Sequence, residues 1–174
     1  MTYLLDLLRF SEPLDYFFAQ RLQYVLESAF PNRKVFSQRD FEREFDYVCC
    51  VLVAYHRGRA HISRAAKLVE EYHEKDLPIE NKIIAAELIL LMCGFFRRQS
   101  RYRGRNTYPL GYYATMARHF YREVCNIFPS RSYGRVSDHF QQWTDALDLL
   151  AKRFEEQSLT PYLIHINKDQ QKGP

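Results

Sequence analysis

Arginine and tyrosine side chains between residues 95 and 135 are the groups in this sequence best suited to bind a charged partner. This Arg window holds nine arginines, one acidic residue and no lysine, a balance of +8, whereas the rest of the chain has 16 basic and 20 acidic residues. Aromatic rings are interleaved with the guanidinium groups in residues 95–113, which read FFRRQSRYRGRNTYPLGYY. Because arginine binds phosphates through a planar fork and stacks on rings and bases, the window predicts an acidic partner.

Nucleic acid is the partner that this pattern favours most. Guanidinium groups bind the phosphate backbone, and exposed bases stack on aromatic rings. The sequence contains no helix-turn-helix, zinc-finger or RNP pattern, so we expect recognition of the RNA or DNA backbone rather than of a base sequence. The candidate contact residues are Arg97, Arg98, Arg101, Tyr102, Arg103, Arg105, Tyr108, Arg118, Arg122, Arg131 and Arg135.

Two other interpretations of the same residues remain open. Arginine and tyrosine are also favoured anchors at protein interfaces, so this face could dock on an acidic protein surface. The arginines could instead pair with carboxylates of their own chain, for which the candidates are Glu70, Glu71, Glu74, Asp145 and Asp148.

A smaller basic cluster lies between two expected helices. It consists of Arg57, Arg59 and Arg64, with histidines at positions 56 and 61. Such a cluster could supply a second phosphate contact or an anion site at a helix end. An exposed loop between helices has the same composition, so the cluster is a secondary candidate.

The sequence gives little support for catalysis or for a bound metal. It has no Walker loop and no glycine fingerprint. Glu70 and His73 have the Glu-x-x-His spacing of diiron bundles, but those sites need a second copy, which is lacking here. Cys49, Cys93 and Cys125 lie on apolar helix faces, where a thiol is inert. We therefore expect no catalytic residue, no metal and no cofactor.

The expected location is the cytoplasm. The four cysteines fall within apolar helical patterns, including the adjacent pair Cys49 and Cys50, and are expected to be buried and reduced. The N-terminal segment lacks the basic region and cleavage site of a signal peptide. The longest apolar run, residues 83–96, is too short to span a bilayer.

Hydrophobic periodicity predicts an all-α fold, a single-domain bundle of five to six helices around a central apolar helix at about 79–96. The domain is expected to cover residues 1–166, with a disordered tail at 167–174. Basic loops are expected at 97–107 and 129–136, and a short strand or helical appendage at 162–166. Glu87, within the central helix, should need an arginine or a tyrosine hydroxyl as its partner. The capping and breaking residues place the helices between Ser11 and Pro31, Ser37 and Gly58, Ser63 and His73, Ile79 and Phe96, Pro109 and Phe128, and Ser137 and Ser158.

The stretch from Phe41 to Leu91 loosely resembles the helix–loop–helix unit of TerB-like domains. In that family the loop carries an Asp-Gly pair, whereas this chain has Arg57-Gly58. The resemblance implies a helical fold for this stretch, and the arginine removes the loop carboxylate on which a metal or acidic-loop role would depend.

The expected function is that of a non-catalytic accessory protein that binds nucleic acid through the Arg/Tyr-rich face of residues 97–135. The 13 tyrosines and 13 phenylalanines exceed what a small monomer easily hides, so we expect a subunit of a larger homo- or hetero-oligomeric assembly. The alternative is a protein-interaction adaptor that docks an acidic partner through the same face.

Overall fold

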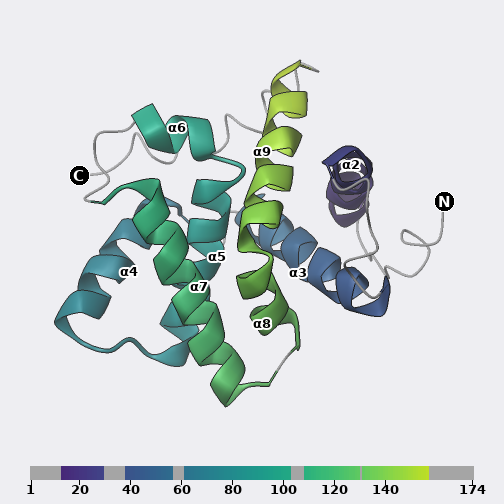
Figure 1. Cartoon of the computed structure of the whole chain (residues 1–174). Coiled ribbons are helices and arrows are strands. Elements are labelled where there is room, and N and C mark those ends of the chain that lie inside the picture. The colour runs from purple at the N-terminus through teal and green to yellow at the C-terminus, as the bar shows by residue number, and fades with distance from the viewer. Residues whose placement is uncertain (1–12, 30–37, 57–60, 103–107, 130, 157–174) are drawn as a thin grey trace.

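The computed structural model describes residues 13–29, 38–56, 61–102, 108–129 and 131–156. Most of these residues are helical and none of them lies in a strand, which confirms the all-α prediction (Figure 1). The short strand or helical appendage expected at 162–166 and the tail expected at 167–174 lie outside the described residues. The described helices are α2 (Pro13–Ala29), α3 (Gln38–His56), α4 (Ser63–Glu74), α5 (Ile79–Cys93), α6 (Arg97–Tyr102), α7 (Leu110–Ile127), α8 (Arg131–Asp138) and α9 (Phe140–Glu156).

Helix α5 lies at the centre of the bundle, as its apolar sequence predicts. Every residue from Leu88 to Cys93 is buried, so the helix has no solvent-facing side along this part of its length. A helix that is apolar nearly all round is stable only when neighbours cover it on all sides. Helices α4, α7 and α9 all pack against it, and α7 lies along most of its length (Figure 1).

The central helix ends at Cys93, three residues earlier than expected, because the chain turns at Gly94. A Cβ atom at this position would lie 2.7 Å from the Cβ of Leu147 on α9. Only glycine therefore allows the two helices to approach this closely. The chain then places Phe95 and Phe96 in the core, with exposed fractions of 4% and 3%.

Two basic segments expected to be loops contain helices, and this part of the prediction is wrong. In α6 Ser100 is buried, four positions after the buried Phe96 that immediately precedes the helix, so one side of the turn faces the core. In α8 the buried residues are Val136 and Ser137, both fully inaccessible to solvent. A short helix needs only one or two buried side chains to be held by its neighbours, and the dense charge of these segments hides that signal.

The prediction that all four cysteines are buried is only partly confirmed. Cys49 and Cys93 are buried, whereas Cys50 is exposed and Cys125 is intermediate. Adjacent residues point in different directions on a helix, and at this place in α3 the core covers the side of Cys49 but not that of Cys50. Burial raises the pKa of Cys93 to about 12, and its thiol therefore stays protonated at neutral pH.

A buried carboxylate joins α3 to the C-terminal helices. Glu44 is fully buried and accepts a hydrogen bond of 2.8 Å from Nε1 of Trp143. Nδ1 of His139 lies 3.0 Å from Oε2 of the same carboxylate, and Nε of Arg135 lies 3.6 Å from Oε1. A carboxylate is tolerated in a core only when it is paired and hydrogen-bonded in this way.

A second carboxylate, that of the half-buried Glu87, has a tyrosine partner, as predicted. The hydroxyl of Tyr47 on α3 donates a hydrogen bond of 2.8 Å to Oε1 of Glu87. Burial raises the pKa of Glu87, and the hydrogen bond from Tyr47 offsets only part of this effect. Tyr121 and Tyr133 complete the surroundings, each with its ring edge-on or nearly edge-on to that of Tyr47.

Removal of the Glu44 carboxylate should strongly destabilise the bundle. Glu44→Ala leaves the Trp143 N–H and two basic groups without their acceptor, which costs about 3–5 kcal/mol for a buried pair. Urea unfolding followed by the fluorescence of Trp143, the sole tryptophan of the chain, measures the change. The control is Glu74, which is exposed at the end of α4. Glu74→Ala should change stability by less than about 0.5 kcal/mol. Similar losses in both variants would contradict the role given to Glu44.

Asp46 on α3 should make stability depend on pH. Burial, with a contribution from the charge of Glu42, raises the pKa of Asp46 from its usual 3.8 to about 6. The folded state therefore binds more protons than the unfolded state between these two values, and stability falls as pH rises through them.

Asp46→Asn removes the titrating carboxyl group, and with it the loss of stability as pH rises. The free energy of unfolding of this variant, measured relative to that of the parent protein, should rise by about 1 kcal/mol between about pH 4 and pH 6 and stay constant at higher pH. This magnitude includes a reduction for solvent screening, because Asp46 is only partly buried. Glu42→Gln should reproduce part of the effect, because it removes the neighbouring charge. Urea titrations at several pH values test this, and a difference between variant and parent that does not change with pH would refute it.

Candidate nucleic-acid interface

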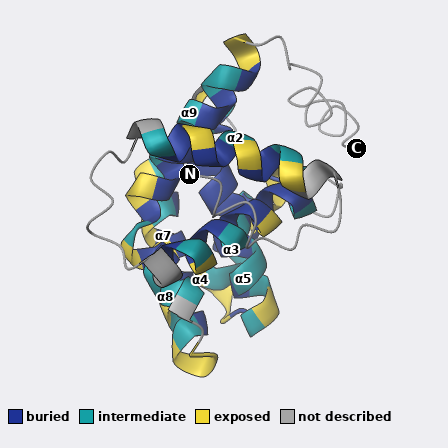
Figure 2. Cartoon of the chain, turned by 90° about the vertical axis from the view of Figure 1, so that its right-hand side faces the viewer, coloured by how far each residue is buried: buried dark blue, intermediate teal, exposed yellow. Residues whose placement is uncertain are grey.

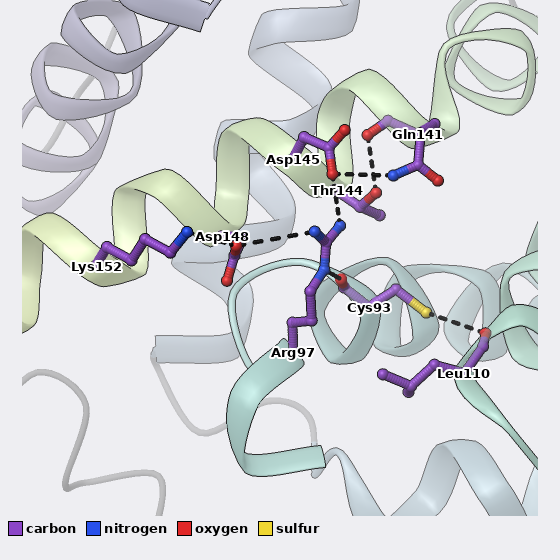
Figure 3. Close-up of polar contacts among 8 residues, drawn as sticks. All are labelled: Cys93, Arg97, Leu110, Gln141, Thr144, Asp145, Asp148 and Lys152. Carbon is purple, nitrogen blue, oxygen red and sulfur yellow. Dashed lines mark hydrogen bonds and ion pairs between the residues drawn. The ribbon is translucent and has the colours of Figure 1, made fainter. Parts of the chain in front are cut away.

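Arg97, the first residue of α6, is bound within the protein (Figure 3). Its guanidinium lies 2.8 Å from Asp145 and 3.8 Å from Asp148, both on α9. Its Nε donates a 2.6 Å hydrogen bond to the carbonyl of Cys93, at the end of α5. Only 19% of the side chain is exposed. Arg97 therefore joins α5, α6 and α9, and a phosphate group could reach it only by displacing two carboxylates.

Two further arginines of the window have carboxylate partners on other helices. Arg98 is paired with Glu155 near the end of α9 at 3.1 Å, in an exposed position. Arg135 on α8 points towards the buried Glu44 on α3. The first pair is a surface contact of small energy, and the second belongs to the buried network around Glu44.

The two arginines of α7 contact α8. Nε of Arg118 donates a hydrogen bond of 3.2 Å to the carbonyl of Ser137, and the Ser137 hydroxyl donates one of 3.0 Å to the Arg118 carbonyl. Arg122 lies 3.7 Å from Asp138, and both side chains are more than half exposed. These two arginines therefore share a face of α7, as their spacing of four residues predicts.

The described arginines of the window do not form one continuous face. Those of α6 contact α9, those of α7 contact α8, and that of α8 contacts α3. The intramolecular pairing that the sequence left open is thus present for Asp145 and Asp148. Among the other proposed acids, Glu71 pairs with Lys75 at 3.1 Å.

Several predicted residues can be placed only in part. Arg64 is exposed at the start of α4. For three residues the structure gives the helix but not the side chain: Arg101 and Tyr102 end α6, and Arg131 begins α8. Four others lie outside the described residues: Arg57, Arg59, Arg103 and Arg105.

Tyr108 belongs to a cluster of three aromatic side chains, the ring cluster, which it forms with His73 on α4 and Tyr112 on α7. The rings of Tyr108 and Tyr112 are 4.6 Å apart, and that of His73 is 5.7 Å from Tyr108. The Tyr112 hydroxyl and Nε2 of His73 share a hydrogen bond of 2.7 Å. His73 is exposed and both tyrosines are half-buried, so the cluster is a rigid aromatic surface in contact with solvent.

Sequence reasoning identified Tyr108 but missed its two neighbours. Tyr112 is four residues later in the same aromatic-rich stretch, residues 95–113, so the composition of that stretch could have indicated it, although Tyr108 precedes α7. His73 comes from α4, and only the packing of α4 beside α7 brings it to this place. No signal in the sequence indicates that contact.

Next to the ring cluster, the charges are balanced within the protein. Lys82 on α5 is only 7% exposed and lies 2.7 Å from Asp76 and 3.1 Å from Glu123. Burial acts to lower the pKa of Lys82, but the hydrogen bonds to these two acids outweigh it and raise the pKa. Tyr72 and His119 are hydrogen-bonded beside this group at 3.0 Å. Lys82 therefore stabilises the bundle and is not available to an anionic ligand.

Comparison with protein-family models, with curated proteins and with solved structures gives no match to this chain. The likeness of residues 41–91 to TerB-like domains therefore remains a resemblance. None of the described helices is both long and apolar enough to cross a membrane. Within the described ranges, no group of three or more histidine, cysteine, aspartate or glutamate side chains is arranged to hold a metal ion.

If Arg97 is a structural residue, its loss should reduce stability far more than the loss of its neighbour. Arg97→Gln removes two charge-assisted contacts from a largely buried site, which should cost about 2 kcal/mol. Arg98→Gln removes one exposed ion pair and should cost less than about 1 kcal/mol. Urea unfolding of both variants measures the difference. Equal effects would show that Arg97 does not have this role.

Proposed function

We propose that this chain is a non-catalytic accessory protein that binds nucleic acid, and that the contact centres on the ring cluster and the arginines that precede it. This region is narrower than the face of residues 97–135 expected from sequence. Arg118, Arg122 and Arg135 have partners within the protein, and they would contribute less to binding than a count of charges suggests.

The observation that carries the proposal is the position of the ring cluster at the point where the Arg-rich segment enters α7. Whatever path residues 103–107 follow, covalent geometry keeps the Cα atom of Arg105 within about 11 Å of that of Tyr108. Arginine side chains next to aromatic rings are the combination that single-stranded nucleic acid requires. The guanidinium groups bind phosphates, while the rings stack on bases at a gain of about 1–3 kcal/mol per base.

The ring cluster and its surroundings also favour single strands over duplexes. A stacking surface can be used only by bases that are unpaired and turned outward. The buried Lys82 and its two acids leave no net positive charge on that side of the cluster. Phosphate binding therefore depends on Arg101, Arg103 and Arg105.

A protein-interaction adaptor is the second candidate. Ile127 is 60% exposed and Phe128 is 51% exposed, both at the end of α7. Exposed apolar side chains of this size are typical anchors of a protein interface. In that case the arginines and the ring cluster would bind an acidic protein surface, and no nucleic acid would be involved.

Replacement of Arg101, Arg103 and Arg105 by alanine should weaken binding and reduce its dependence on salt. Fluorescence polarisation with labelled mixed-sequence single strands of RNA and DNA gives the affinity at several salt concentrations. Each lost phosphate contact on a single strand lowers the magnitude of the slope of log K against log salt by about 0.7, so this slope should be smaller by about 2 in the triple variant.

Tyr108→Ala should weaken binding by at least about tenfold through lost stacking, with little change in slope.

Arg118→Gln with Arg122→Gln is the matched control, because it removes two arginines from the same window outside the proposed site. It should leave affinity and slope close to those of the parent protein. Absence of binding by the parent protein at about 50 mM salt would refute the proposal, as would equal effects of the control and the triple variant. Recovery of a stoichiometric acidic protein by the parent, and not by the triple variant, would then favour the adaptor.

A further inference from the structure

A hollow of about 310 Å³ lies between α2 and α9, on elements that take no part in the ring cluster. The two helices lie side by side, as two views at right angles show (Figure 1 and Figure 2). Three residues from each helix line the hollow: Gln20, Arg21 and Tyr24 from α2, and Leu150, Arg153 and Phe154 from α9.

Both arginines of this hollow are held against aromatic rings. The guanidinium carbon of Arg21 lies 3.7 Å from the centre of the Phe17 ring, and that of Arg153 lies 4.3 Å from the centre of the Tyr24 ring. Stacking of this kind fixes a guanidinium in place while leaving its N–H groups able to donate. The two cations are therefore positioned before any ligand arrives.

Among the described residues, these two arginines differ from those of the Arg window in having no anionic partner. Each described arginine side chain of that window contacts a carboxylate or a carbonyl, whereas no ion pair joins Arg21 or Arg153 to an acid in the described part of the chain. Both are partly buried, and the buried Nε of Arg21 has no hydrogen-bond partner there. A partly buried cation without a counter-charge is costly, and a bound anion would remove that cost.

The rest of the lining is apolar or neutral. Leu150 and Phe154 are fully buried and form the base of the hollow, so the apolar wall that a ligand can touch is the ring of Tyr24, which is 58% exposed. Gln20 adds an amide that can donate or accept a hydrogen bond. Pockets of this kind, mostly apolar with a few converging polar groups, are typical of small-molecule sites.

We propose that this hollow binds a small organic anion, with a carboxylate or phosphate group between Arg21 and Arg153 and an apolar body against the ring of Tyr24. At about 30 Å³ per atom, the volume admits roughly ten non-hydrogen atoms. This corresponds to a single aromatic ring that bears one oxyanion. The site is independent of the proposed nucleic-acid contact, which involves α4, α7 and the segment before α7.

Calorimetric titration of the full chain with four probes tests the chemistry. Benzoate and phenyl phosphate supply the oxyanion and the ring, benzamide is the uncharged counterpart of benzoate, and inorganic phosphate lacks the apolar body. Benzoate or phenyl phosphate should bind in a saturable way. Benzamide should bind at least about tenfold more weakly, because charge-assisted hydrogen bonds to arginine are lost. Weaker binding of inorganic phosphate than of phenyl phosphate would show that the apolar wall contributes, and stronger binding of phenyl phosphate than of benzoate would favour a phosphate ligand over a carboxylate.

Substitution of the arginines tests the location. Arg21→Gln and Arg153→Gln should each weaken binding of the preferred anion by at least about tenfold. Arg43→Gln, at an exposed arginine of α3, is the matched control and should bind like the parent protein. Arg21→Lys and Arg153→Lys keep the charge and the aliphatic stem, so they separate loss of the site from loss of the fold, and circular dichroism checks that all variants are folded.

Three results would overturn the proposal. The first is the absence of saturable binding of both aromatic anions up to about 10 mM, a concentration that would fill even a millimolar site. The second is equal affinity for benzoate and benzamide, and the third is equal affinity of the glutamine variants and the parent. Nucleic-acid binding should be unchanged in Arg21→Gln and Arg153→Gln, so this test can fail or succeed separately from that of the proposed function.

Discussion

The need to cover α5 on every side determines how the other helices are arranged. Along Leu88–Cys93 no side chain of this helix reaches solvent, so each direction around it must be filled by another element. Helix α7 provides the longest contact, while α4 and α9 close the remaining sides. Both candidate binding surfaces lie on this outer layer. The ring cluster forms where α4 meets α7, and the hollow forms where α9 meets α2.

Apolar burial of this kind has little directional preference, and a small number of buried polar groups specify the packing more closely. Glu44, Glu87 and Lys82 each lie in or near the core, and each is bonded to a side chain on a different element. A shift of one helix past another would leave at least one of these groups buried without its partner, at a cost of several kcal/mol. These contacts therefore favour one alignment of the helices over others with similar apolar contact.

Much of the fold could be predicted because its long helices bury regular apolar stripes. The periodicity of apolar residues indicated α2, α3, α4, α5, α7 and α9, and the continuous apolar run of α5 identified the central helix. Helices α6 and α8 were missed because few of their residues face the core, and their arginines resemble those of a solvated loop. The need of Glu87 for a partner was also predictable, since it follows from burial alone. That the partner is Tyr47 depends on the packing of α3 beside α5.

The candidate site was less predictable, because the net charge of a segment does not show in which direction its side chains point. The excess of arginine in residues 95–135 is real, but Arg97 and Arg135 are turned inward to acids on α9 and α3. Conversely, His73 on α4 joins Tyr108 and Tyr112 through a contact between distant segments that no local pattern reports. The arginines of the hollow were not singled out at all, since Arg21 and Arg153 lie far apart in sequence and outside the basic window.

The contacts of Arg97 also bear on the entropy of binding. They hold the start of α6 to α9, and the packing of Tyr108 on Tyr112 holds the chain again at the start of α7. A segment anchored at both ends has far fewer conformations available than a free arm of the same length. Binding to a segment that is anchored at both ends therefore costs less conformational entropy than binding to a free arm, and more of the contact energy remains as affinity. A protein with few arginines at its binding surface could in this way bind as tightly as one with a longer, unanchored basic tail.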